Sequence, residues 1–105
     1  MIEALEDKKA EDILLIDLKG VTSFTDYFVL CNGTSARMLD ALAKTAQETG
    51  KGKLKRKPRI EGQPHDGWML VDFGDVLVHI FTPDQRKHYD LEELWNEGKV
   101  LLKVQ

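Results

Sequence analysis

The most regular hydrophobic pattern in the chain lies in two runs of residues, 68–73 and 76–81. Both runs are rich in β-branched and aromatic residues, and Gly74 and Asp75 separate them. A glycine-containing pair between two such runs is typical of a two-residue hairpin turn. The pattern therefore predicts an antiparallel hairpin in which Trp68 faces Phe81 across the two strands.

Side chains alternate between the two faces of such a hairpin. One face is entirely apolar and should lie against the core; it comprises Met69, Val71, Phe73, Val76, Val78 and Ile80. The other face, which we call the mixed hairpin face, comprises Trp68, Leu70, Asp72, Leu77, His79 and Phe81. Large apolar side chains on this scale, if exposed, usually mark a binding surface. The alternative is that a helix covers them.

The first half of the chain predicts a helix, two strands and a second helix, in this order. Residues 1–10 have roughly helical spacing of apolar positions, which indicates a short amphipathic helix. The apolar runs at 12–18 and 26–33 indicate two strands buried on both faces. Apolar residues recur at three-four spacing over 36–50, which predicts a helix.

Proline and capping signals organise the rest of the chain. Pro58 lacks an amide donor, so 59–61 form a short edge strand at most. Thr-Pro-Asp-Gln at 82–85 is an N-terminal capping pattern, and Asp90 repeats it with Glu93. The segment is therefore either one kinked helix or two short ones, and the tail after residue 98 stays ambiguous. The whole order predicts one α/β domain over residues 1–105.

Composition narrows the class of protein. The chain has 105 residues, 42% hydrophobic and 31% charged, which is typical of a globular domain. The single cysteine, Cys31, excludes an internal disulfide and suits a reducing compartment. The N-terminal sequence has the pattern of neither a signal peptide nor a transmembrane span, so we expect a cytoplasmic protein without membrane contact.

The charge is unevenly placed along the chain. The net charge of -3 argues weakly against a general nucleic-acid binder, yet six of the nine residues 51–59 are basic. Lys55, Arg56 and Lys57 could contact phosphates of RNA. The competing interpretation is a solvated loop and an edge strand protected by charge, since no aromatic residue interleaves with the run.

Polar residues on the hairpin raise the question of catalysis. With the predicted register, Asp72 and Asp75 diverge across the turn, so a metal site is not expected. His79 lies diagonally from Asp72, and a hydrogen bond between them would raise the pKa of the imidazole. This pair could orient a catalytic base, but a structural histidine is favoured. We therefore predict no catalytic residue, and for Cys31 a buried apolar role.

A strand-to-helix junction at 32–35 carries a second candidate site. Its sequence, Asn-Gly-Thr-Ser, offers free helix amides that could bind a phosphate. A glycine-rich phosphate loop would require more glycines or a lysine at fixed spacing. An N-cap at Thr34 or Ser35 is favoured, and no cofactor is expected.

Four motifs together resemble a known family. They are DYFVLCNGTSARML, PRIEG, GWMLVDFGDVLVHIF and YDLEELW, in this order. The chain closely resembles the Iojap family of ribosomal silencing factors, RsfS, over about residues 2–95. The resemblance implies a nucleotidyltransferase-like α/β sandwich, a mixed β-sheet flanked by helices. Catalytic nucleotidyltransferases need an Asp-x-Asp pair, which is missing from the hairpin strands of this chain. The resemblance therefore implies a non-enzymatic relative.

The resemblance also implies a partner and a mechanism. The partner is the large ribosomal subunit, chiefly its protein L-fourteen, at the surface that bridges to the small subunit. Occupation of that surface would block subunit joining and lower translation when nutrients run short. The alternatives are a nucleotide-binding, nucleotidyltransferase-like enzyme suggested by 32–35, and an RNA-binding module suggested by 51–59.

The expected contact residues follow from the mixed hairpin face and the last helical segment. They are Trp68, Leu70, Asp72, Asp75, Leu77, His79 and Phe81, with Tyr89, Leu91 and Trp95 as a second group. Acidic groups there would suit a basic ribosomal protein, and the net negative charge would help to steer the encounter. The basic run would face ribosomal RNA. A homodimer is also expected if the same face associates with itself when free.

Overall fold

The chain folds around one six-stranded sheet, and the computed structural model describes residues 1–51 and 57–104. The elements are α1 (Ile2–Asp7), β1 (Glu11–Asp17), β2 (Tyr27–Asn32), α2 (Ala36–Lys51), β3 (Arg59–Glu61), a 3-10 turn (Pro64–Asp66), β4 (Trp68–Asp72), β5 (Val76–Phe81), α3 (Pro83–Tyr89), α4 (Leu91–Leu94) and β6 (Lys99–Val104). The strand order is β3-β4-β5-β2-β1-β6, with β2 and β5 parallel and the other pairs antiparallel. The expected mixed sheet is confirmed.

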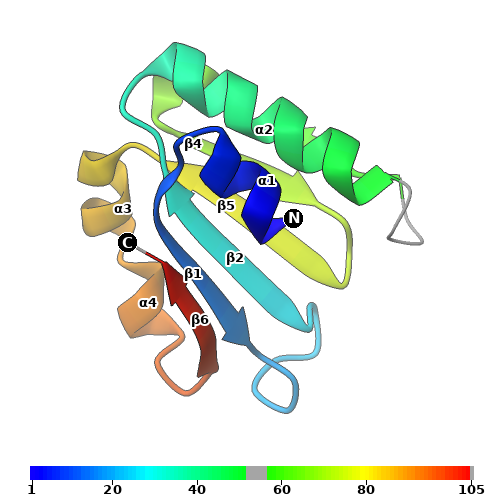
Figure 1. Cartoon of the computed structure of the whole chain (residues 1–105). Coiled ribbons are helices and arrows are strands. Elements are labelled where there is room, and N and C mark those ends of the chain that lie inside the picture. The colour runs from blue at the N-terminus through cyan, green and yellow to red at the C-terminus, as the bar shows by residue number, and fades with distance from the viewer. Residues whose placement is uncertain (52–56, 105) are drawn as a thin grey trace.

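The helices lie on two sides of the sheet. In Figure 1, α1 and α2 cover one face, whereas α3 and α4 lie together along one side of the sheet, near β6. Ser35 caps α2, because its Oγ accepts from the amide of Met38 at 3.2 Å. The apolar stripe of α2 is fully buried against the sheet; it comprises Leu39, Leu42, Ala43 and Ala46. The prediction of an N-cap at this junction is confirmed.

The hairpin has the predicted register. Trp68 pairs with Phe81, Leu70 with His79 and Asp72 with Leu77. Gly74 in the turn has a φ of 85°, a conformation that favours glycine. The apolar face joins the core beneath α1 and α2: Met69, Val71, Phe73, Val78 and Ile80 are buried, and Val76 is partly buried against them.

A second apolar cluster fills the opposite face of the sheet. It comprises Leu14, Ile16, Leu18, Phe28, Leu30, Phe81 and Leu91, with Val21, Trp68, Leu77 and Trp95 packed around it. Strand β2 contributes to both clusters, and its residues from Phe28 to Asn32 are all buried. This confirms the prediction that the second strand is buried on both faces. Strand β1 begins with two exposed acids, Glu11 and Asp12, so it is less completely buried than expected.

The C-terminal third resolves what the sequence left open. Two short helices, α3 and α4, follow the hairpin, and Thr82 caps the first by accepting from the amide of Gln85 at 3.4 Å. Asp90 joins the helices with a φ of 48°, and its side chain makes no capping hydrogen bond, so the predicted second cap is wrong. Asp90 has a left-handed backbone, whereas a capping residue usually has an extended one. The ambiguous tail forms β6, which pairs with β1 at the edge of the sheet.

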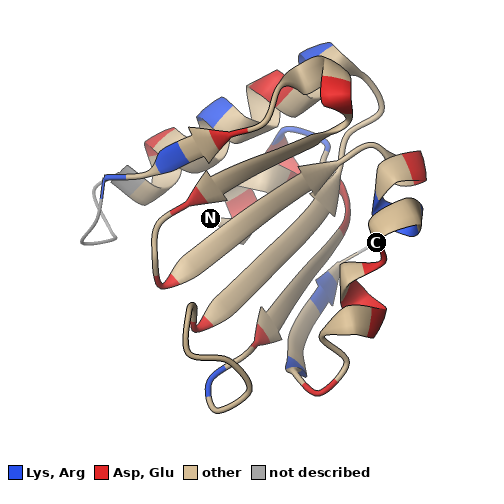
Figure 2. Cartoon of the chain, turned by 180° about the vertical axis from the view of Figure 1, so that it is seen from behind, with Lys and Arg blue, Asp and Glu red and all other residues tan. Residues whose placement is uncertain are grey.

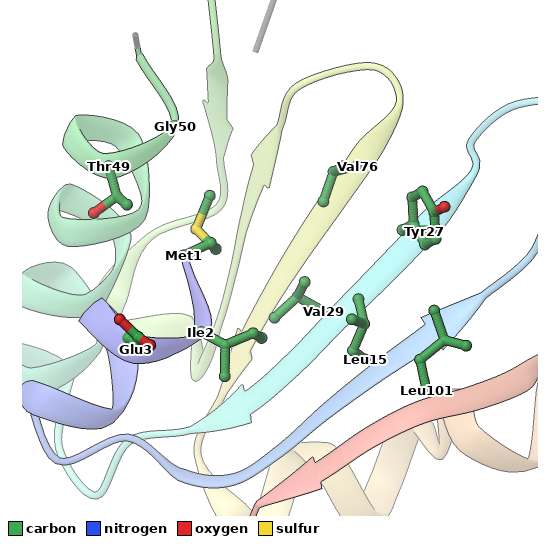
Figure 3. Close-up of a pocket in the computed structure, with 10 residues that line it drawn as sticks. All are labelled: Met1, Ile2, Glu3, Leu15, Tyr27, Val29, Thr49, Gly50, Val76 and Leu101. Carbon is green, nitrogen blue, oxygen red and sulfur yellow. The ribbon is translucent and has the colours of Figure 1, made fainter. Parts of the chain in front are cut away.

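Helices α1 and α2 leave part of their face of the sheet open. A largely apolar groove of about 610 Å³ lies there. Figure 3 shows the residues that line it: Met1, Ile2, Glu3, Leu15, Tyr27, Val29, Thr49, Gly50, Val76 and Leu101. Leu101 on β6 is 45% exposed beside this groove. The groove lies on the opposite side of the sheet from the mixed hairpin face. It therefore offers control positions for experiments on that face.

Candidate partner-binding surface

Trp68 is the centre of the mixed hairpin face. Its indole Nε1–H donates to Nδ1 of His79 at 3.2 Å. Its ring stacks on Phe81 with centroids 5.1 Å apart, and Tyr89 of α3 lies 4.4 Å away. Trp68 is only partly buried in this arrangement. It is therefore a held, partly exposed aromatic side chain, the type that anchors many protein interfaces.

His79 is a structural histidine. Its side chain is 5% exposed, and burial lowers the pKa of its imidazole to about 4, so it is neutral at pH 7. Because Nδ1 accepts from Trp68, the ring proton lies on Nε2, which has no hydrogen-bond partner among the described residues. The ring of Phe28 packs edge-on against it at 4.6 Å. These contacts orient Trp68 and leave no accessible base.

The predicted hydrogen bond between His79 and Asp72 is wrong, and so is the expected rise in the pKa of the imidazole. Asp72 instead accepts from the amide of Gly74 at 2.7 Å and lies 3.6 Å from the guanidinium of Arg59. The short side chain of Asp72 therefore contacts groups in the turn and in the neighbouring strand β3. His79 accepts its hydrogen bond from Trp68 instead.

An aromatic row crosses this face of the sheet. From Trp68 and His79 it continues through Phe28 to Trp95, 5.9 Å apart, and from Trp95 to Phe24, 5.6 Å apart. Its two ends are exposed, because Tyr89 is 47% and Phe24 is 54% exposed. Sequence reasoning missed Phe24. The available signal was an aromatic residue inside a polar connection between two buried strands.

The predicted contact residues separate into three groups by exposure. Asp75 and Tyr89 are exposed, whereas Trp68, Leu70, Asp72, Leu77 and Trp95 are half-buried. His79, Phe81 and Leu91 are buried, at 5%, 0% and 9% exposure. These three cannot be surface contacts in this structure, because they are buried; they support the surface from below. The second group also divides, since Tyr89 and Trp95 lie towards opposite ends of the row.

A pocket of about 560 Å³ opens beside Trp68, lined by Glu61, Gly62, Asp66, Leu70 and Tyr89. Its lining combines the apolar and aromatic side chains of Trp68, Leu70 and Tyr89 with the carboxylates of Glu61 and Asp66. Seen from this side in Figure 2, β2 and β5 carry no charged residue, and acidic residues lie at the ends of strands and on α3 and α4. The surface therefore combines an uncharged centre with charged surroundings, in which basic residues on α3 and β6 accompany the acidic ones.

Among the described residues, the other candidate sites show neither a reactive thiol nor a metal-binding cluster. Burial raises the pKa of the Cys31 thiol to about 12, so it is not a ready nucleophile. Within residues 1–51 and 57–104, no three histidine, cysteine or acidic side chains gather as they would around a metal ion. In the same part of the chain, no helix is long and apolar enough to cross a membrane. Lys57 is exposed, while Lys55 and Arg56 lie outside the described residues.

Comparison with known proteins identifies the family. A family model described as "Ribosomal silencing factor during starvation" matches residues 1–105. The chain belongs to this family. The ribosomal silencing factor RsfS of Bacillus subtilis is 39% identical over 90% of this chain and 80% of its own length. The resemblance predicted from the four sequence motifs is thus confirmed.

Two further matches extend the comparison. A crystal structure of a Chromobacterium violaceum protein superposes with a TM-score of 0.83 at 39% identity, over 90% of this chain and 79% of that one. The mouse protein named mitochondrial assembly of ribosomal large subunit protein 1 is 37% identical over 90% of this chain, which spans 43% of the mouse protein. The α/β fold of the silencing-factor family is therefore shared by solved structures.

Proposed function

We propose that this chain binds the large ribosomal subunit through the surface around Trp68 and blocks association with the small subunit. The observation that carries the proposal is a partly exposed Trp68, fixed by its hydrogen bond to His79, beside a pocket lined by apolar, aromatic and acidic side chains. Membership of the silencing-factor family supports a ribosomal target. The name of the mouse relative, which refers to the large subunit, supports the choice of subunit.

The partner on that subunit is protein L-fourteen, as the family resemblance implies. A ribosomal protein is typically basic, and Glu61 and Asp66 place carboxylates beside Trp68. Such complementarity favours rapid and oriented encounter. A patch of roughly 800 Å² per partner, with an aromatic anchor at its centre, is sufficient for a specific interface.

The mechanism is steric exclusion. It requires a rigid, complementary surface and no covalent chemistry, which suits a site whose histidine is buried and neutral. While the protein occupies the bridging surface of the large subunit, the small subunit cannot join, and translation falls. We place this activity in the cytoplasm, during nutrient limitation.

A subunit-joining assay tests the proposal. Purified protein added to separated subunits should reduce the yield of joined ribosomes on a sucrose gradient. Trp68→Ala should raise the protein concentration required for half-maximal inhibition by roughly 30-fold or more, as for an interface hot spot. Leu101→Ala removes an exposed apolar side chain from the opposite side of the sheet and should leave joining inhibited. Equal inhibition by Trp68→Ala and the unmodified protein would contradict the proposal.

We also propose that the basic run at 51–59 faces ribosomal RNA. Lys57 is exposed and the side chain of Arg59 is 79% exposed, which suits contact with phosphates. Neutralising Lys55, Arg56 and Lys57 together should reduce both the affinity for the subunit and its dependence on salt. An unchanged salt dependence would contradict a contact between this run and RNA.

Self-association of the free protein through the Trp68 surface would compete with subunit binding. Sedimentation at increasing protein concentration would detect this self-association.

A further inference from the structure

Helix α3 carries Tyr89 to the partner-binding surface, yet apolar burial does little to hold it. None of its seven residues is buried. A helix of this length is marginal on its own in water. Its start is tied to the sheet by the amide of Thr82, which donates to the carbonyl oxygen of Gly67 at 2.9 Å. The remainder of the helix needs another anchor.

Arg86 supplies that anchor. Its Nη1 donates to the backbone carbonyl oxygen of Asp12 and, at 3.0 Å, to Oδ1 of Asn32. Its Nε donates to Oε1 of Glu92 at 3.3 Å. The side chain is 11% exposed, although it starts from a helix with no buried residue. One guanidinium therefore joins α3 to β1, β2 and α4.

Two of the three acceptors for Arg86 are themselves fixed in the sheet. Asn32 is 5% exposed at the end of β2, and its Nδ2 donates to Oδ2 of Asp12 at 3.5 Å. Asp12 has a φ of 49° and lies where the pairing of β1 with β2 shifts register. A backbone conformation that is rare for a non-glycine residue persists only where its surroundings determine it. The anchor point is thus well defined.

We infer that Arg86 is a positioning residue of the partner-binding surface. It holds α3 against the sheet so that Tyr89, three residues later on the same helix, packs on Trp68. The distance between the Tyr89 and Trp68 rings, 4.4 Å, is the consequence of that placement. The effect on binding rests on the function proposed above, whereas the effect on the Tyr89–Trp68 contact does not.

Arginine suits this role better than lysine. Its planar fork reaches several acceptors at once, and two of the three here are neutral oxygens that a fixed geometry must meet. A lysine would keep the charge but present one rotating ammonium group. Arg86→Lys should therefore hold α3 only in part, and Arg86→Met, which keeps the length of the side chain, should release it.

The first experiment uses the free protein. Nuclear magnetic resonance follows the indole N–H of Trp68 and the ring signals of Tyr89 in Arg86→Met, Arg86→Lys and the control Lys87→Met, which removes a neighbouring exposed cation. Arg86→Met should shift both residues' signals, Arg86→Lys should shift them less, and the control should leave them in place. Unchanged signals in folded Arg86→Met, or in Arg86→Lys if the former does not fold, would overturn the inference.

The second experiment measures affinity for isolated large subunits. Arg86→Met should bind about tenfold more weakly, with Arg86→Lys between it and the unmodified protein. If Arg86 acts through Tyr89, adding Arg86→Met to Tyr89→Ala should cause no further loss, whereas independent losses that add would overturn this route. Normal binding by Trp68→Ala would instead refute the proposed function. The nuclear magnetic resonance result would still decide whether Arg86 positions Tyr89 against Trp68.

Discussion

The hairpin β4–β5 and the helix pair α3–α4 both contribute to the surface around Trp68, but different forces hold them. The hairpin places Val71, Val78 and Ile80, all with 0% exposure, into the core. Helix α3 buries no residue and depends on the hydrogen bonds of Arg86. The burial of apolar side chains is the larger stabilising effect, at about 1.5–3 kcal/mol for each large aliphatic residue. The hairpin is therefore the fixed half of the surface, and α3 is the half held by polar contacts.

This difference suggests how the surface works. Trp68 is held from below by Phe81 and from the side by His79, so its position depends on the core. Tyr89 reaches Trp68 from a helix that polar contacts position. A partner would meet a preorganised anchor with one neighbour held by polar contacts, which limits the ordering cost of binding.

Removing core packing beneath the hairpin should have the largest effect. Ile80→Ala deletes part of a fully buried side chain and should lower the free energy of unfolding by about 3 kcal/mol. Urea titration followed by circular dichroism measures the change. Leu101→Ala, at a position 45% exposed, should stay within about 0.5 kcal/mol of the unmodified protein. Similar losses for the two variants would show that the hairpin is not the fixed half.

Acid should loosen the hairpin side of the surface through His79. Burial lowers the pKa of His79 from 6.5 to about 4, so the folded protein binds a proton less readily than the unfolded chain. The contribution of neutral His79 to the free energy of unfolding is therefore fully present above pH 6.5. It is lost as the pH falls towards 4, which lowers the free energy of unfolding by up to about 3 kcal/mol. His79→Gln, which can still accept from Trp68, should flatten this part of the stability profile. An equally steep profile in His79→Gln would assign the acid sensitivity to other groups.

Loss of the helix cap should have the smallest effect and should act on α3 alone. Thr82→Ala removes the acceptor for the amide of Gln85 and should cost about 1 kcal/mol. Hydrogen exchange should accelerate at the amides of α3 while those of β5 keep their protection. If the amides of both elements lost protection equally, the helix and the hairpin would form one cooperative unit and the distinction between them would fail.

The same two regions show which features the sequence could predict. The hairpin register followed from a period of two and a Gly-Asp turn, which are local signals. The family followed from four motifs in order. The role of Arg86 could not be predicted, because its acceptors lie in β1, β2 and α4 and include a backbone carbonyl that no residue type reveals. Strand β6 also gave no clear local signal, since its pairing with β1 depends on a distant strand.

The error at His79 has the same origin. The sequence placed His79 and Asp72 on one face, which the structure confirms, but it could not rank their competing partners. In the structure, the backbone amide of Gly74 donates to the carboxylate of Asp72, and the indole of Trp68 donates to the imidazole of His79. Burial then decided the direction of the pKa shift. Contact residues were likewise assigned by face, although Phe81 and Leu91 lie under other side chains.

Hydrogen exchange of the protein with and without isolated large subunits tests the central claim most directly, because it maps the bound surface without a mutation. Binding through the Trp68 surface predicts slower exchange in β4 and α3, with β6 unchanged at the opposite edge of the sheet. Slower exchange in α1 and β6, with β4 and α3 unaffected, would place the subunit on the other face and contradict the account.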